Sequence, residues 1–256
     1  MKRLFPLLLI TSSVWAKPIV LIGHFDAFGN ATLNNATEVA LELVKRNKDH
    51  PDFELKLCEL KTVFDKSYYQ LEDCLKALPE VPKMVLGLGE ANCNIKIETM
   101  GRNLDNTKGP DNEGIERKNE IIIPGAPKEF GFNYPLPQMY CALESKERNL
   151  LEVSNNAGSF VCNNLAYQFS YKYQDTVFGF IHVPANNCRD LPERSEVAVN
   201  LLTKMISAAV KEEEVVRLST SKDELQLLRR QFKNDRCLSE FYKRTKGADE
   251  KGIWPF

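Results

Sequence analysis

A cysteine, a histidine and a glutamate stand in this 256-residue sequence where they could act together on a carbonyl group. Cys162 lies in the first turn of an expected helix, after the polar, glycine-containing segment 154–159. A helix amino end stabilises anions, so it would favour a thiolate and its free amides could hold an oxyanion. His182 ends an apolar strand, and Glu98 ends an alternating run. Their types fit a nucleophile, a base and an acid that orients the base, the set of a thiol hydrolase.

Spacing alone leaves other interpretations of these residues open. Cys162 could be packed as a small hydrophobe, and His182 could serve as a structural hydrogen-bond donor. Glu98 could be a solvated charge at a strand end, or the trio could bind a metal ion. No close-set pair of cysteines or histidines has the spacing of a structural zinc site, and nothing else in the sequence favours a metal, so we expect none.

Strands and helices alternate along the first third of the chain. We expect strands at 18–25, 53–60 and 83–89, and helices at 33–46 and 68–78. This order predicts an α/β fold, a three-layer α/β/α sandwich around a mainly parallel twisted sheet in a single domain. In such sheets, sites gather at the carboxyl ends of the strands.

The middle of the chain is less regular. Residues 101–118 form a polar, turn-rich stretch that we interpret as a functional loop. Beyond it we expect strands at 119–124 and 176–183 and helices at 136–149, 160–171 and 195–211.

The two ends of the chain differ from the expected domain at 17–211. Residues 1–16 join a basic start to a short apolar run and a small-residue ending, the plan of a secretory signal peptide. Residues 212–256 form a charged extension with one amphipathic helix expected at 222–232. We therefore expect an exported protein, periplasmic or secreted, with no membrane attachment once the leader is removed.

The number of cysteines and the charge balance further limit the class of protein to which this sequence can belong. In an oxidising compartment, seven cysteines suggest three disulfides and one free thiol, with a pairing that the sequence does not reveal. The 34 Lys and Arg against 35 Asp and Glu offer no surplus for nucleic acid. The 14 Phe and 8 Tyr supply a core, which excludes a disordered chain.

Four segments together resemble the pyroglutamyl-peptidase I family of cysteine peptidases. Residues 23–30, Gly-His-Phe-Asp-Ala-Phe-Gly-Asn, are similar to the family's amino-terminal segment. Residues 154–167 are similar to its cysteine signature, and residues 179–184, Gly-Phe-Ile-His-Val-Pro, to its histidine segment. Residues 97–114 resemble its glutamate segment and the Asp-Asn-x-Gly loop that follows. The likeness runs from about Pro18 to about Lys211 in family order.

The resemblance implies a role for each of these residues. Cys162 would be the nucleophile, His182 the general base and acid, and Glu98 the residue that orients His182. The backbone of Cys162 and the side chain of Lys108, which stands where the family usually has arginine, would hold the oxyanion.

It also implies the substrate, a peptide with an amino-terminal pyroglutamate. Phe25 and Phe28 would sandwich the flat lactam ring, and Leu88 could bind it through its main chain. The resemblance implies no cofactor. It does imply that the protein associates into homo-oligomers.

Three departures from the family pattern leave alternatives to this enzyme. Glu90 and Thr99 replace the family's usual small and basic residues, and Lys108 keeps a charge but lacks the planar fork of arginine. One alternative is a non-catalytic relative that binds a peptide or partner through the cleft. The other is a thiol hydrolase whose substrate has shifted, with Glu90 favouring a cationic group.

Overall fold

The computed structural model describes residues 17–211, 236–237 and 241. The expected leader 1–16 and the expected helix at 222–232 lie outside the described residues. Within the described part, no helix is long and apolar enough to cross a membrane.

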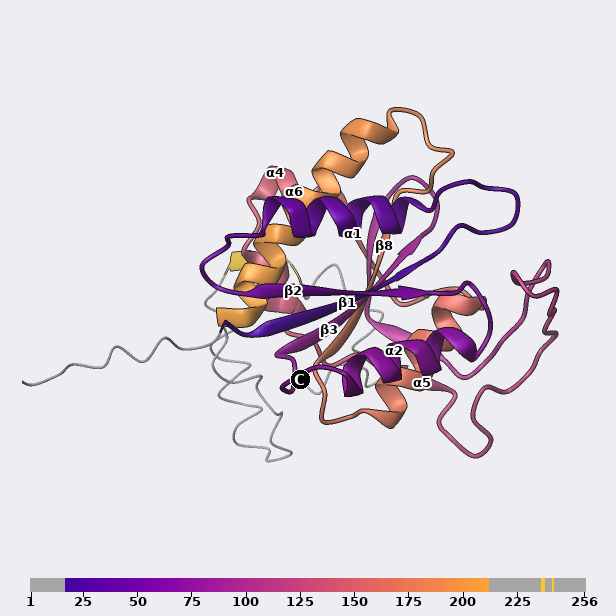
Figure 1. Cartoon of the computed structure of the whole chain (residues 1–256). Helices are drawn as coiled ribbons and strands as arrows, with labels where there is room; N and C mark the ends of the chain where they lie inside the picture. Colours follow the sequence, from indigo (N-terminus) through magenta and orange to yellow (C-terminus); the bar gives the residue numbers. More distant parts are fainter. Residues whose placement is uncertain (1–16, 212–235, 238–240, 242–256) are drawn as a thin grey trace, which may run out of the picture.

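A six-stranded sheet forms the centre of the molecule, in the order β2-β1-β3-β8-β4-β7 (Figure 1). The strands are β1 (Ile19–Phe25), β2 (Glu54–Leu60), β3 (Met84–Glu90), β4 (Ile95–Glu98), β7 (Leu151–Ser154) and β8 (Phe178–Val183). The first three and β8 run parallel, whereas β4 is antiparallel to β8 and parallel to β7. Because β4 runs antiparallel to β8, Glu98 at the carboxyl end of β4 lies opposite Phe180, which is within β8.

Helices cover both faces of this sheet. On one face lie α1 (Asn35–Arg46), α3 (Leu136–Cys141), α4 (Ser145–Arg148) and α6 (Leu191–Lys211), and on the other lie α2 (Lys66–Lys76) and α5 (Val161–Lys172). Helix α6 packs on both α1 and α3, and α2 packs on α5. The predicted α/β fold with a mainly parallel sheet in a single domain is confirmed.

Burial explains why the central strands carry continuous apolar runs. All seven residues of β1 are buried, because helices lie on both of its faces. Strand β2 forms one edge and buries only Cys58 and Leu60 fully. The sequence signal is therefore strongest in the middle of the sheet.

A second, two-stranded sheet was not predicted. Strands β5 (Met100–Arg102) and β6 (Glu129–Gly131) pair in antiparallel fashion and contact α5. Each strand has only three residues, too few for a pattern of alternation. Strand β7, with four residues, was missed for the same reason.

The strand expected at 119–124 is wrong. Only Glu120 forms an isolated bridge, with Asp105. Further along, Asn103 accepts from the backbone N–H of Ile123 (2.8 Å) and donates to its carbonyl (2.8 Å). The side-chain amide thus takes the place of a neighbouring strand. Ile121 is 58% exposed, so this isoleucine run does not enter the core.

The helix expected at 136–149 is two helices. Helix α3 ends at Cys141, and α4 begins after Glu144. Glu144 and Glu147 form a capping box, with the Glu144 backbone N–H donating to the Glu147 carboxylate at 2.9 Å. A capping box starts a new helix, and here it interrupts the apparent continuity of the pattern.

Six of the cysteines form three disulfides. These are Cys58–Cys74, Cys93–Cys188 and Cys141–Cys237. Cys162 is the free thiol. The expectation of three pairs and one free cysteine is confirmed.

Candidate active site

The free thiol lies in the first turn of α5. Cys162 is its second residue, after the N-cap Phe160, and is half-buried. Upstream, Gly158 has a φ of +88°, a conformation that a side chain would strain. The first backbone N–H groups of a helix have no partner within the helix, so the amino end of α5 can bind an anion.

His182 and Glu98 meet through the antiparallel pairing of β4 with β8. Lys96 lies opposite His182 and Glu98 opposite Phe180, which places Glu98 and His182 as diagonal neighbours on one face. The Nδ1 atom of His182 lies 2.8 Å from Oε1 of Glu98. Both side chains are removed from solvent, with residue exposures of 4% for His182 and 0% for Glu98. Their contact fixes the ring so that Nε2 is left for another partner.

Cys162 lies next to His182, and a glycine permits this close approach. The Cys162 thiol is close enough to His182 to raise the pKa of the imidazole. A Cβ atom placed on Gly89 of β3 would lie 2.9 Å from Cys162 Sγ and 3.2 Å from Cδ2 of His182. The bare backbone at this position therefore lets helix and strand approach each other. The structure thus places Cys162, His182 and Glu98 near one another.

The electrostatics of the three groups favour a charged histidine. Burial lowers the pKa of His182, but the Cys162 thiol and the Glu98 carboxylate act against burial and raise the pKa overall. Burial raises the pKa of Glu98, and the hydrogen bond and charge of His182 bring it below the usual value. Glu98 thus stays ionised at neutral pH and supports a protonated imidazole.

Phe28, Phe160 and Phe64 form a group of rings next to Cys162 that we call the aromatic wall. Phe28, 40% exposed, packs edge to face on Phe160 with ring centroids 5.0 Å apart. Phe64 also packs on Phe160, with ring centroids 5.3 Å apart. Phe160 and Phe64 were not among the site residues predicted from the sequence. The position of Phe160 directly before Val161 and Cys162 was the signal that could have found it.

Phe25 and Leu88 lie deeper than Phe28. Phe25 is buried at the end of β1, with its ring 6.4 Å from that of Phe180. Phe180 in turn packs on His182 at 5.1 Å. Leu88 is fully buried in β3, with its main chain between β1 and β8. Phe25 and Phe28 thus lie in different aromatic groups, one under the histidine and one beside the cysteine.

Lys108 is exposed on the loop between β5 and β6. The loop is attached beside the helix that carries Cys162: Asn106 donates its backbone N–H to the carbonyl of Ser159 (3.0 Å), and Ser159 Oγ donates to the carbonyl of Asn106 (2.7 Å). Asn112 of the same loop accepts from the backbone N–H of Gly29 (3.1 Å) and donates to the carbonyl of Ala27 (2.8 Å). This loop therefore connects the segment carrying Phe28 to that carrying Cys162.

The Glu90 side chain has a structural partner, whereas the buried Thr99 hydroxyl has no hydrogen-bond partner among the described residues. The Glu90 carboxylate accepts from the backbone N–H of Asn35 (2.7 Å) at the start of α1, where a negative charge is favourable. Thr99 is buried, and its backbone N–H donates to the carbonyl of Ser154 (2.8 Å). The contact with Asn35 accounts for Glu90, and nothing in the structure explains Thr99.

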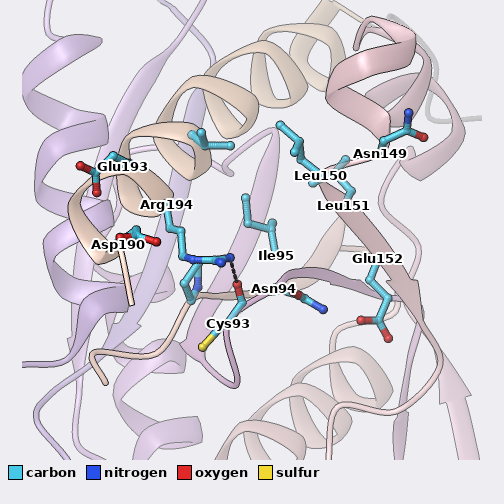
Figure 2. A pocket seen from close by; sticks show the side chains of 12 residues that line it. Cys93, Asn94, Ile95, Asn149, Leu150, Leu151, Glu152, Asp190, Glu193 and Arg194 are labelled. Carbon is cyan, nitrogen blue, oxygen red and sulfur yellow. Dashed lines mark hydrogen bonds between the residues drawn. The ribbon is translucent and has the colours of Figure 1, made fainter. Parts of the chain in front are cut away.

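A hollow of about 400 Å³ lies on the α6 side of the sheet. Figure 2 shows Ile95, Leu151 and Arg194 among its lining residues, with the Arg194 guanidinium donating to the carbonyl of Cys93 at 2.8 Å. None of the three clustered residues lines it, so this hollow is separate from the thiol. Within the described part of the chain, no three His, Cys, Asp or Glu side chains are grouped so that they could hold a metal ion.

Comparison with known proteins places the whole described domain in one family. The sequence model described as pyroglutamyl peptidase matches residues 18–215. The pyrrolidone-carboxylate peptidase of Staphylococcus carnosus is 34% identical over 202 residues, which cover 75% of this chain and 91% of that protein. That of Thermosipho africanus is 32% identical over 206 residues, covering 75% and 97%.

Solved structures agree with this assignment. The pyroglutamyl peptidase I of Bacillus amyloliquefaciens superposes with a TM-score of 0.66 at 26% identity, covering 77% of this chain and 99% of that one. A mutant pyrrolidone carboxyl peptidase of Pyrococcus furiosus superposes with a TM-score of 0.65 at 26% identity, covering 77% and 100%. With a free cysteine beside a buried histidine and glutamate in this fold, the chain belongs to the pyroglutamyl-peptidase I family of cysteine peptidases.

Proposed function

We propose that this protein is an exported peptidase that removes an amino-terminal pyroglutamyl residue from peptides with Cys162, His182 and Glu98. The observation that carries the proposal is the grouping of the free thiol, a histidine and a glutamate: Cys162 and His182 both lie against Gly89, and His182 is hydrogen-bonded to Glu98. A thiol, a histidine and a carboxylate in this order make up the machinery of acyl transfer through a cysteine.

Each residue has one task in the proposed reaction. The thiolate of Cys162 bonds to the carbonyl carbon of the pyroglutamyl residue. The bond to the next residue then breaks as His182 gives its proton to the leaving amine. Water, deprotonated by His182, attacks the thioester, releases pyroglutamate and restores the thiolate. Glu98 holds the imidazole through Nδ1 and stabilises its charged form.

The neutral lactam ring fits the apolar surroundings of the thiol. We place it against Phe28, with Phe25 lining the deeper side, because a flat ring offers two apolar faces to aromatic groups. Phe160 supports Phe28 from behind, with the two rings 5.0 Å apart. Hydrogen bonds to the lactam edge would come from main-chain groups near Leu88.

The oxyanion would lie at the amino end of α5. The backbone N–H of Cys162 is one donor in this proposal, and the Lys108 ammonium is a second charge that approaches from the loop. The hydrogen bonds between Asn106 and Ser159 support this placement, because they tie the loop to the chain just before α5. The contact of Glu90 with Asn35 argues against a substrate selected by the charge of Glu90.

Export is the cellular part of the proposal. The signal-like residues 1–16 and three disulfides support an oxidising destination, in the periplasm or outside the cell. Substrates would then be pyroglutamyl peptides met outside the cytoplasm. Self-association into homo-oligomers stays a prediction from family resemblance.

Release of a reporter amine from a pyroglutamyl substrate tests the reaction. Purified protein with intact disulfides should release the amine, and Cys162→Ala should abolish release while it retains the thermal melting temperature. A prolyl reporter, which lacks the lactam carbonyl, should be released at least about a hundredfold more slowly, because unpaired polar groups in a site reject such analogues strongly. Folded wild-type protein with a free thiol but no turnover would refute the proposal.

A further inference from the structure

A charged cluster lies beneath the aromatic wall, away from the reacting atoms. We call it the Arg117 cluster, and its members are Arg117, Asp65, Asp105, Asn164 and Gln168. The guanidinium of Arg117 bonds to two carboxylates, with Nη2 2.6 Å from Asp65 Oδ2 and Nη1 2.8 Å from Asp105 Oδ2. Asp105 is fully buried, and the Arg117 side chain is 17% exposed. A cation that bridges two carboxylates from separate segments joins those segments.

The cluster is attached to the nucleophile's helix. Asn164, two residues after Cys162, donates to Asp105 Oδ2 (2.8 Å) and accepts from the backbone N–H of Asp65 (3.1 Å). Gln168, one turn further along, donates to Asp65 Oδ1 (2.9 Å). Helix α5, the start of α2 and the loop between β5 and β6 therefore meet at Arg117.

The same arginine supports the aromatic wall. Its guanidinium carbon lies 4.6 Å from the centroid of Phe64, at the distance of a cation–π contact. Phe64 packs on Phe160, which packs on Phe28. A displacement of Arg117 would thus be transmitted through two rings to the proposed lactam site.

The backbone of Arg117 also fixes the residue before Lys108. Thr107 donates its backbone N–H to the carbonyl of Arg117 (2.8 Å), and Thr107 Oγ1 accepts from the backbone N–H of Arg117 (3.3 Å). One residue consequently holds both the aromatic wall and the segment that presents Lys108.

We propose that Arg117 is a positioning residue for substrate recognition, which holds Phe28 and Lys108 in place without touching the substrate. This inference rests on the proposed pyroglutamyl-peptidase function. Lysine cannot replace it, because one ammonium is a point charge and cannot span two carboxylates as the planar guanidinium does. The contact of Cys162 with His182 does not pass through the cluster, so the reactivity of the thiol should survive the loss of Arg117.

The test compares Arg117→Lys and Arg117→Met with Lys66→Met. Lys66 pairs with Glu113 at 2.6 Å, both about half exposed, and joins the same loop to the same helix start. We expect KM for the pyroglutamyl reporter to rise about tenfold or more in both Arg117 variants, because small displacements of binding groups are costly. The rate of Cys162 alkylation by iodoacetamide should stay unchanged. The control Lys66→Met should keep the wild-type KM.

The split between KM and kcat separates positioning from a merely structural role. A variant that only folds poorly has fewer active molecules, which lowers kcat and leaves KM unchanged. An unchanged KM in folded Arg117→Lys would overturn the proposal, with or without a fall in kcat. Arg117→Lys keeps the positive charge, so it provides a folded variant if Arg117→Met does not fold.

Amide hydrogen exchange keeps this inference separate from the reaction itself. In the Arg117 variants, exchange should become faster in residues 105–117, whereas Lys66→Met should match the wild type there. If the wild-type protein shows no pyroglutamyl turnover, the proposed function fails, and exchange still reports whether Arg117 holds the loop. Unchanged exchange in both Arg117 variants would overturn the positioning role.

Discussion

His182 and Glu98 contact each other in a buried site, so a substitution of either residue should affect the other. Their side-chain atoms are 2.8 Å apart, and neither residue is more than 4% exposed. A buried charge that loses its partner is strongly unfavourable, so removing either group should change the protonation of the other. The pH dependence of activity should therefore show whether the contact between His182 and Glu98 is intact.

Glu98→Gln should move the alkaline limb of the activity profile to lower pH. Glu98 raises the pKa of His182, so the imidazole keeps the proton for the leaving amine to a higher pH than a free histidine would. Without the carboxylate this pKa falls, and the proton is lost at lower pH. We expect kcat/KM at pH 7 to fall about a hundredfold, in the range that a positioned acid–base group contributes.

The measurement is kcat/KM as a function of pH for wild type and variant. Glu152→Gln is the control, because Glu152 lies on the neighbouring strand β7 with its side chain 47% exposed and pairs with Lys96 at 3.5 Å. The control should keep the wild-type profile. An unshifted alkaline limb in Glu98→Gln would contradict the role given to Glu98.

Two contacts between elements position the site. At the carboxyl end of β3, the main chain of Gly89 approaches both Cys162 and His182. Farther along, helices α2 and α5 are joined by Glu72, whose carboxylate accepts from Tyr68 (2.7 Å) and Tyr173 (2.6 Å). The first contact determines where the thiol lies, and the second keeps the two helices of that face together.

Gly89→Ala should impair the reaction more than the fold. The added methyl would lie 2.9 Å from Cys162 Sγ, so the thiol or the imidazole must move by several tenths of an ångström. Displacing reacting groups by such amounts costs about tenfold or more in rate. Steady-state kinetics and thermal melting would be measured together. Gly109→Ala, whose added Cβ meets no atom within 4 Å, should match wild type in both.

Glu72→Gln should remove part of the protein's sensitivity to acid. Hydrogen bonds from Lys76, Tyr173 and Tyr68 lower the pKa of Glu72 to about 2. A carboxyl with a lowered pKa stabilises the fold above its unfolded pKa, and this stability is lost as the pH falls through the folded value. The wild type should therefore lose stability between pH 4.5 and about 2, and the variant should lose less.

Urea unfolding at several pH values measures this difference. Glu80→Gln, at an exposed residue beyond the end of α2, should follow the wild-type curve. Equal slopes of unfolding free energy against pH in wild type and Glu72→Gln would show that Glu72 does not link α2 to α5 electrostatically.

Two of the three disulfides join segments that are far apart in the sequence. Cys93–Cys188 joins the chain after β3 to the chain after β8, and Cys141–Cys237 fastens the carboxy-terminal extension to α3. The extension also places Phe241, fully buried, against Tyr140 with centroids 5.2 Å apart. At this scale the extension packs onto the domain at these residues.

The order in which disulfides stabilise the molecule can be predicted. Cys141–Cys237 closes a loop with a sequence separation of 96 and Cys58–Cys74 one of 16. On the chain-entropy argument, serine replacement of the first pair should cost about 1.6 kcal/mol more than replacement of the second. Thermal melting of the two double variants would measure this. A larger loss for the Cys58–Cys74 variant would show that local contacts outweigh chain entropy.

Labelling of thiols checks the same arrangement. Native protein should react at one cysteine, Cys162, and reduced, unfolded protein at all seven. Peptide mapping that finds labels on several cysteines but none at Cys162 would contradict both the disulfide pairing and the nucleophilic role proposed for Cys162.

Much of the fold, and the residues proposed to react, could be predicted from local pattern. Apolar runs bounded by turns located β1 and β3, because burial on both faces leaves a continuous signal. Cys162 was found by its place at a helix start, and His182 by its place at a strand end. Periodicity failed at 119–124, where the side chain of Asn103 replaces a neighbouring strand. It also failed for β5, β6 and β7, which are too short to show a period.

By itself, the sequence determined the order of the central strands and helices along the chain and the three residue types that could do the chemistry. Only the tertiary structure decided that β4 turns antiparallel to β8, which places Glu98 against His182 across a sequence separation of 84. It alone revealed that Arg117 joins Asp65 to Asp105 and supports Phe64. The physical reason is that propensity and periodicity act over a few neighbouring residues, whereas strand partners and ion pairs depend on which distant surfaces the whole chain buries together.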